Sequence, residues 1–252
     1  MINNIYIPYV NGTAIYLPLF VRIFRKLEAD ILIYLDSIEA TEIMLPKVIS
    51  IVDVEALLAH NPRFVEEWST EQYKVFDSSN HHIGYLAHWQ CEPIYRNLEA
   101  ILENIADNSK SITIFFDNSG YSYRKEAVDT AFSKNEFQRI EVFMVGSEEK
   151  VIETIEGILN YFVNYFKVYG AKIVDRPEES FGGKEEVKDV VVYSKDREIE
   201  IIGSHIHRAS FAGIIGWPEG GHRITACCGI ATSRMAMIKV QGAAVEENLT
   251  KS

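Results

Sequence analysis

The sequence predicts an α+β fold in which helices flank a largely antiparallel sheet. Segments with strand and helix patterns follow one another without the regular βαβ alternation of a parallel sheet. Short turn signals separate several of the apolar runs, as expected of hairpins, and Asp117-Asn118-Ser119-Gly120 is the clearest of them. Because 47% of the 252 residues are hydrophobic and no linker or repeat divides the chain, we expect a single domain over residues 1–252.

In the first third of the chain, the clearest element is a long amphipathic helix. Apolar residues between Phe20 and Leu27 recur at helical spacing and predict a helix over Leu17–Leu35, which Leu17-Pro18 would begin. Ile43–Ile49 is predicted to be a strand, and Pro46 within it favours a position at a sheet edge or an interface. A short helix and two strands should follow, at Val52–His60, Tyr73–Phe76 and Gly84–Ala87.

Two further helices carry clear boundary signals. Ile94–Ile105 is amphipathic, with Pro93 near its first turn. Ser147–Tyr169 has acidic residues at its positive end and stops at Gly170, a common C-terminal residue of helices. The other predicted elements are four strands and one helix opened by a glycine: Ile173–Val174, Val187–Tyr193, Glu198–Ile202 and Arg223–Cys228, followed by the helix Gly229–Val240.

The middle of the chain contains the pattern of a hairpin that carries charges on one face. An apolar run, Ser111–Phe116, precedes a second run in which Phe137, Arg139 and Glu141 fall at period two and therefore share a face. If the runs pair, one face gathers two cations, two carboxylates and a ring: Arg124, Arg139, Glu126, Glu141 and Phe137. Arginine can hold a phosphate by two parallel bonds and a ring can stack on a base. The pattern is compatible with a nucleotide platform, but from the hairpin alone a surface hairpin with solvated charges is the preferred interpretation.

Two cysteines and a glutamate form a candidate metal set. Cys91, Glu141 and Cys227 are each expected at a strand end or on a sheet face. Two thiolates and one carboxylate leave one zinc position open, which is typical of a catalytic or substrate-binding zinc. Their spacing lacks a CxxC signature, so from spacing alone buried free cysteines are the simpler interpretation.

The C-terminal third contains a second candidate ligand site. Small residues between Thr225 and Arg234 lie at a strand-to-helix junction, where backbone and ligand can approach closely. Arg234 falls about one turn into the helix and could meet a phosphate, or it could be an ordinary surface arginine. His205-Ile206-His207 places two rings on one side of an extended chain, and structural histidines are the preferred interpretation because no base–nucleophile partner is in view.

Charge and cysteine content limit the function classes. The formal net charge of −11 argues against a general surface for nucleic acids, although it leaves room for a local basic pocket for ATP. Three cysteines are too few for a disulfide framework and indicate a reducing compartment, so we expect a cytoplasmic protein. No secretory signal pattern or membrane-spanning run is visible.

Taken in order, these segments resemble the catalytic domain of class II aminoacyl-tRNA synthetases. Glu42-Ile43-Met44-Leu45-Pro46 is similar to the first class motif, and Tyr123-Arg124-Lys125-Glu126 with Phe137 is similar to the second. Gly229-Ile230-Ala231-Thr232-Ser233-Arg234 is similar to the third. The resemblance implies a class II synthetase-like antiparallel sheet flanked by helices, a homodimer, and a catalytic domain without a tRNA-binding appendage.

Within this class, the chain resembles the branch with a zinc-dependent seryl-type site. That branch comprises the atypical seryl-tRNA synthetases and the amino acid–carrier protein ligases. The similarity lies in Cys91 after the strand Tyr85-Leu86-Ala87, in Phe137-Gln138-Arg139-Ile140-Glu141, in Ser204-His205-Ile206-His207 with Phe211, and in Cys227 before Arg234.

The resemblance implies a role for each candidate residue. Arg124 would hold the α-phosphate of ATP and Arg234 the γ-phosphate, while Phe137 would stack on adenine and Glu126 would bind its amino group. Cys91, Glu141 and Cys227 would hold zinc, with Arg139 facing the site beside them. An acidic residue of the strand after Val187–Tyr193 would hold Mg²⁺; Glu198 and Glu200 are the candidates, and Glu200 is our assignment.

The implied activity is ATP-dependent activation of a small amino acid and its transfer to the phosphopantetheine thiol of a carrier protein. The acidic charge argues against tRNA as the acceptor, but tRNA or another small acceptor stays open as an alternative. A second alternative is a synthetase paralogue with impaired catalysis that serves as a binding or regulatory subunit. Ala231 and Thr232-Ser233 support it, because they depart from the usual third motif.

Overall fold

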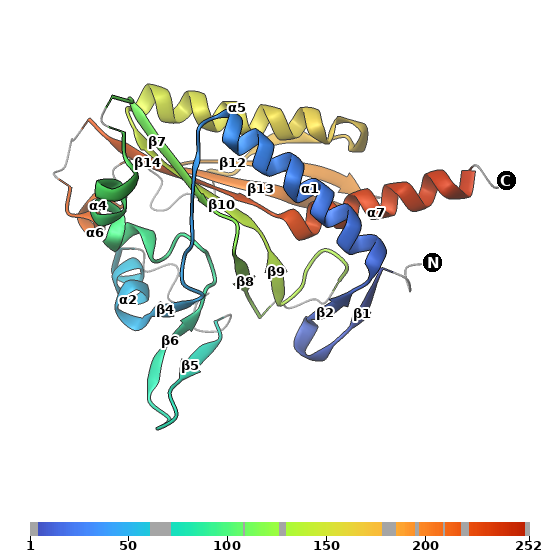
Figure 1. The fold of residues 1–252 in the computed structure, drawn as a ribbon, viewed down its shortest axis with the longest axis horizontal. Coiled ribbons are helices and arrows are strands. Elements are labelled where there is room, and N and C mark those ends of the chain that lie inside the picture. Colours follow the sequence, from blue (N-terminus) through green and yellow to red (C-terminus); the bar gives the residue numbers. More distant parts are fainter. Residues whose placement is uncertain are drawn as a thin grey trace.

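A seven-stranded sheet forms the centre of the computed structural model, which describes residues 5–60, 72–107, 109–125, 130–177, 185–194, 197–208, 210–217 and 222–249 (Figure 1). The strand order is β11-β12-β13-β14-β10-β7-β3. Every neighbouring pair is antiparallel except β3 and β7. The predicted α+β fold with a largely antiparallel sheet is thereby confirmed.

The strands of this sheet are β3 (Thr41–Ile43), β7 (Ile112–Asp117), β10 (Ile140–Gly146), β11 (Lys172–Asp175), β12 (Glu186–Ser194), β13 (Arg197–Arg208) and β14 (Ile224–Ile230). The long helices are α1 (Pro18–Ser37), α5 (Glu148–Tyr165) and α7 (Thr232–Leu249). The shorter helices are α2 (Ile51–His60), α4 (Ile94–Ile105) and α6 (Ala212–Ile215), with 3-10 turns η2 (Val10–Gly12) and η3 (Lys167–Tyr169).

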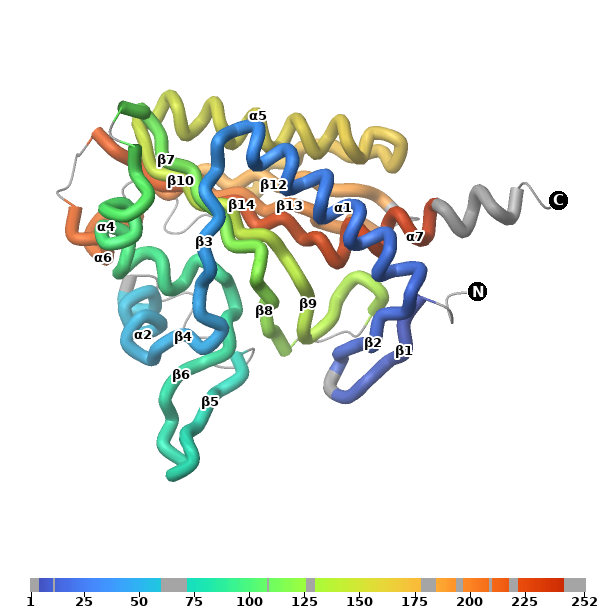
Figure 2. Tube along the Cα trace, viewed as in Figure 1, coloured from blue at the N-terminus to red at the C-terminus, as the bar shows by residue number. Residues whose placement is uncertain are grey.

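Three small sheets surround the central one. They are the hairpin β1 (Tyr6–Pro8) with β2 (Ala14–Tyr16), the sheet β4 (Val48–Ser50), β6 (His82–Leu86) and β5 (Lys74–Phe76), and the pair β8 (Tyr121–Tyr123) with β9 (Glu136–Gln138). Along the tube in Figure 2, β8 and β9 continue from the ends of β7 and β10. The predicted central hairpin therefore pairs along two lengths, first through β7–β10 and then through β8–β9.

The central sheet has a separate core on each face. One core contains side chains of α1, α5 and α7 together with Ala226, Cys228 and Ile230 of β14. The other contains side chains of α4 together with Cys227 of β14 and Phe143 of β10. Because side chains alternate along a strand, the two neighbouring cysteines of β14 enter opposite cores. Both faces of β14 are covered, and all of its residues are buried.

Local signals placed several helix ends well. Pro18 is the first residue of α1, and α4 spans the predicted Ile94–Ile105. Ser147 caps α5 by accepting a hydrogen bond from the Lys150 N–H at 3.4 Å. Gly170, with φ of 71°, ends the η3 turn that follows α5.

Two predicted boundaries differ from the structure. The helix predicted from Gly229 begins at Thr232, because β14 continues to Ile230 and pairs there with both β10 and β13. The strand predicted over Ile43–Ile49 is divided into β3 and β4, which belong to different sheets, and Pro46 lies between them. In the described part of the chain, no helix combines the length and apolar character needed to cross a membrane.

Candidate active site

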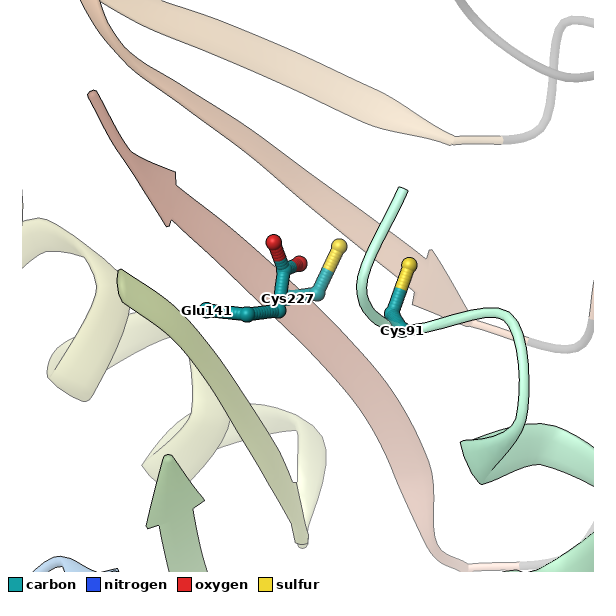
Figure 3. Close-up of side chains that lie close together, drawn as sticks. All are labelled: Cys91, Glu141 and Cys227. Atoms are coloured by element: carbon teal, nitrogen blue, oxygen red, sulfur yellow. The ribbon is translucent and has the colours of Figure 1, made fainter. Parts of the chain in front are cut away.

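Two cysteines and a glutamate, far apart in sequence, converge on the face of the sheet that α4 covers. Cys91 lies in the turn before α4, Glu141 on β10 and Cys227 on β14. Their ligand atoms all lie within 4.8 Å of one another, and the three residues are buried. Figure 3 shows the side chains reaching into the same space from a loop and two strands. The antiparallel register explains the pair on the sheet, since it sets Glu141 opposite Gly229 and Phe143 opposite Cys227.

The chemistry of this set fits a zinc ion. Two sulfurs and one carboxylate oxygen are common zinc ligands, and three protein ligands leave a fourth position for a substrate. Glu141 Oε2 accepts a hydrogen bond from Arg139, whereas Oε1 is buried and has no hydrogen-bond partner among the described residues. A hydrogen bond with Cys91 and burial both raise the pKa of the Cys227 thiol. A buried acceptor without a partner beside two thiols is the arrangement that a bound cation would complete.

Arg139 supplies the opposite charge beside this set. Its guanidinium is paired with the Glu141 carboxylate. Burial opposes its charge, yet the nearby Glu141 raises the pKa of Arg139 above its ordinary value. The guanidinium occupies the space beside Gly229, where a Cβ would overlap it. This close approach explains why glycine stands within a paired strand, one residue before its end.

Gly229→Ala should displace the Arg139 guanidinium and destabilise the fold. We expect a loss of about 1–3 kcal/mol in the free energy of unfolding, because the displaced guanidinium leaves the buried Glu141 carboxylate without its partner. Gly157→Ala is the control: nothing lies within 4 Å of its added Cβ, so a helix-stabilising change of up to about 1 kcal/mol is expected. Urea unfolding of both variants measures the difference, and equal stabilities would contradict the assigned packing.

The second group of candidate residues surrounds the ring of Phe137. Arg124, which follows β8, has its guanidinium carbon 5.5 Å from the ring centroid. Arg234, in the first turn of α7, has its own guanidinium carbon 5.6 Å from the same centroid. The Arg234 Nε donates to the Phe132 carbonyl oxygen at 3.0 Å, which holds the guanidinium against the loop before β9. The two arginines therefore share one site, while Glu126 lies outside the described residues.

A β-bulge decides which acidic residue of β13 reaches this site. The pairing of β12 with β13 shifts between Val190, opposite Ile202, and Val191, opposite Glu200. The extra residue, Ile201, places Glu200 on the same face of the strand as Gly203. A Cβ built at Gly203 would lie 3.1 Å from the Glu200 Oε1. Gly203 pairs with Gly229, so this is also the face of Glu141.

Glu200 is the better placed of the two magnesium candidates. Its Oε2 lies 3.4 Å from the Arg234 Nη1. Glu198 is instead paired with Arg176 and accepts a hydrogen bond from the Tyr193 hydroxyl at 2.6 Å. A cavity of about 320 Å³ opens beside them and brings three arginines together with three acids. It is lined by Arg176, Arg197, Arg234, Asp189, Glu198, Glu200, Phe132, Ser133 and Ile199.

Three buried residues near the sulfurs carry polar contacts that sequence reasoning did not assign. Glu92 accepts hydrogen bonds from the His88 and Trp89 N–H groups at 3.3 and 3.1 Å, which shapes the turn that presents Cys91. Burial raises the pKa of Glu92 to about 8. Tyr95 and His207 also contact the sulfurs. Tyr95 lies on the apolar face of α4, where its spacing indicates only a core residue.

Comparisons with known proteins agree with this fold. No protein-family model matches the sequence. The type-2 serine–tRNA ligase of Methanocaldococcus jannaschii is 42% identical over 84 residues, which cover 31% of this chain and 15% of that protein.

Two solved structures are similar over nearly the whole chain. One is M. kandleri SerRS, crystallised in complex with A. aeolicus tRNASec, with a TM-score of 0.69, 18% identity, and coverage of 90% of this chain and 52% of that chain. The other is the prolyl-tRNA synthetase of Cryptosporidium parvum complexed with L-proline and AMP, with a TM-score of 0.74, 13% identity, and coverage of 93% and 50%.

The fold is that of a class II aminoacyl-tRNA synthetase catalytic domain, which confirms the predicted resemblance at the level of the fold. The chain spans about half the length of these two structures and a smaller share of the serine–tRNA ligase.

Proposed function

We propose that this chain uses ATP to activate a small amino acid as an aminoacyl-adenylate and transfers it to the phosphopantetheine thiol of a carrier protein. The observation that carries the proposal is the convergence of Cys91, Glu141 and Cys227 on one buried site, together with the two arginines that flank the ring of Phe137. The strands β9 and β10 connect the two places, since Phe137 and Glu141 lie four positions apart on one hairpin arm.

Nucleotide binding is assigned to the residues around Phe137. Arg124 would hold the α-phosphate, Arg234 the γ-phosphate, and the ring would stack on adenine, with Glu126 at the adenine amino group. Glu200 would hold Mg²⁺ beside Arg234. The mixture of arginines and acids around the 320 Å³ cavity suits a magnesium–polyphosphate ligand, because the acids can face the cation and the arginines the phosphates.

Amino-acid binding is assigned to the buried face near Cys91. A zinc ion held by Cys91, Glu141 and Cys227 would act as a template that binds the amino group of the substrate. Arg139 balances the Glu141 charge, and the buried rings of Tyr95, Phe143 and Phe211 belong to the same apolar core as Cys91 and Cys227.

The chemistry has two steps. The substrate carboxylate attacks the α-phosphorus of ATP and releases pyrophosphate, giving the aminoacyl-adenylate. The carrier thiol then attacks the carbonyl carbon of the adenylate and releases AMP. Arg124 and Arg234 stabilise charge on the phosphates and hold the reactants in line, so this chain contributes positioning and electrostatic stabilisation.

The two alternatives differ in acceptor and in activity. Similarity to a serine–tRNA ligase and to two solved synthetases supports tRNA as the acceptor, whereas the net charge of −11 argues against it. The impaired-paralogue alternative rests on the unusual third motif. In that motif, however, the Thr232 hydroxyl donates to the Gln138 carbonyl and the Ser233 hydroxyl accepts from the Gln138 N–H, both at 2.9 Å. These bonds fix the start of α7 to β9 beside Phe137, so Thr232 and Ser233 have a structural role in placing Arg234.

Amino-acid-dependent exchange of pyrophosphate into ATP, measured across the standard amino acids, should give a signal for a small amino acid. Intact-mass measurement should then show the aminoacyl mass on a phosphopantetheinylated carrier protein. Exchange together with charging of tRNA alone would replace the carrier by tRNA. Absence of exchange with every amino acid would contradict activation and favour the binding subunit.

We also propose a homodimer. β3 is an edge strand of the central sheet, and Met44 directly after it is 81% exposed. An exposed apolar side chain at an open edge suits a contact with a second copy of this chain. Light scattering should give twice the 28.7 kDa mass of the chain, and a monomer at micromolar concentration would contradict this arrangement.

A further inference from the structure

We infer that Tyr95 and His207 are positioning residues that hold the two sulfurs of the candidate metal site, one hydrogen bond to each. The inference rests on the proposed metal site and adds two residues that act on it through Cys91 and Cys227. In this role, Tyr95 and His207 would raise the affinity for the metal and stabilise the negative charge on the two sulfurs.

The contacts form a continuous buried chain. The Tyr95 hydroxyl donates to Cys91 Sγ at 3.7 Å and lies 3.4 Å from His207 Nε2. His207 Nε2 is also 3.4 Å from Cys227 Sγ, and its Nδ1 is 3.0 Å from Thr225 Oγ1. Tyr95, His207 and Thr225 are each at most 4% exposed. Water therefore does not compete for these bonds.

The hydrogen-bonding capacity of these groups matches two metal-bound thiolates. A neutral imidazole has one N–H and one acceptor nitrogen. With the proton on Nε2, His207 donates to Cys227, and Nδ1 accepts from the Thr225 hydroxyl. Tyr95 then donates to Cys91, so each sulfur receives one donor. Groups that orient metal ligands in this way are a regular feature of metal sites.

The charge balance favours a neutral histidine here. Zinc with two thiolates and one carboxylate carries a net charge of −1, which the adjacent Arg139 cation balances. A neutral donor therefore stabilises the sulfur without adding a second cation to the site.

A purely packing role is the competing explanation, because both rings contact Phe211. The centroid of Phe211 lies 4.2 Å from that of Tyr95 and 4.8 Å from that of His207. Tyr95→Phe keeps the ring and removes only the donor. His207→Gln retains an N–H near the Nε2 position, whereas His207→Leu removes it. The control Tyr165→Phe loses a hydroxyl bond of 2.6 Å to Asp30 in the other core.

The test measures zinc affinity by competition with a chromophoric chelator, and the sulfur-to-cobalt charge-transfer band of the Co²⁺-substituted protein. Tyr95→Phe and His207→Leu should each weaken zinc binding about 10–100-fold. Both should shift the band to longer wavelength, because a thiolate without its donor is oxidised more easily. His207→Gln should restore much of the affinity, and Tyr165→Phe should match the parent.

Parent affinity and an unshifted band in folded Tyr95→Phe and His207→Leu would overturn the inference while leaving the metal site in place. If the parent itself bound neither zinc nor cobalt, this inference and the zinc assignment would both fail. Pyrophosphate exchange by that metal-free parent would still support amino-acid activation, so the two failures can be told apart.

Discussion

Cys91→Ala should remove bound zinc and abolish amino-acid activation. The substitution leaves Glu141 and Cys227 as two ligands, which are too few for a stable buried zinc site. Zinc content should fall from about one ion per chain to near zero, and pyrophosphate exchange should fall about 100-fold or more because the substrate is no longer positioned. Metal analysis and exchange assays on the same preparation measure both effects.

Cys228→Ala is the matched control for this experiment. Cys228 is adjacent to a candidate ligand in sequence, but its side chain is fully buried in the core on the opposite face. This variant should lose some stability through the small cavity and retain zinc and exchange activity. Full activity of Cys91→Ala, with no loss of metal, would refute the zinc assignment.

Arg124→Ala should leave the fold and the metal content intact and remove adenylate formation. The guanidinium lies beside the Phe137 ring, and under the proposed function it stabilises charge on the α-phosphate during attack. Loss of one such electrostatic contact lowers rates by about 10²–10³-fold. Arg124→Lys should recover only part of the rate, because lysine keeps the charge but loses the planar fork.

Arg96→Ala provides the control for loss of an arginine. Arg96 lies on α4, 42% exposed, and forms an ion pair with Asp53 at 3.0 Å. Its removal should change stability by less than about 1 kcal/mol and leave the exchange rate unchanged. Circular dichroism should be the same for both variants. Exchange by Arg124→Ala at the parent rate would show that the second-motif resemblance is misleading.

Local signals in the sequence were sufficient for many helix ends and for the central hairpin. The proline and amphipathic spacing at α4, the serine cap at Ser147 and the glycine stop at Gly170 act within one or two turns of the chain. The alternation of Phe137, Arg139 and Glu141 likewise depends only on strand geometry. These features could be predicted because their causes lie in neighbouring residues.

The resemblance to class II synthetases predicted a shared metal site for residues whose sequence spacing does not indicate one. Cys91, Glu141 and Cys227 have no motif spacing, and from spacing alone buried free cysteines were the simpler interpretation. The same limit applies to Tyr95. Its helical spacing predicts a core residue but does not predict a hydrogen-bond partner for its hydroxyl. Periodicity reports which face a residue occupies and says nothing about which distant residue faces it.

By itself, the sequence determined the fold class, most of the element types and the order of the three motifs. Only the tertiary structure decided that β14 runs on to Ile230, that the bulge at Ile201 moves Glu200 beside Arg234, and that Tyr95 and His207 meet the two sulfurs. The physical reason is strand register: side-chain direction reverses with every single-residue shift, and the shift is set by pairing between strands rather than by the strand's own residues.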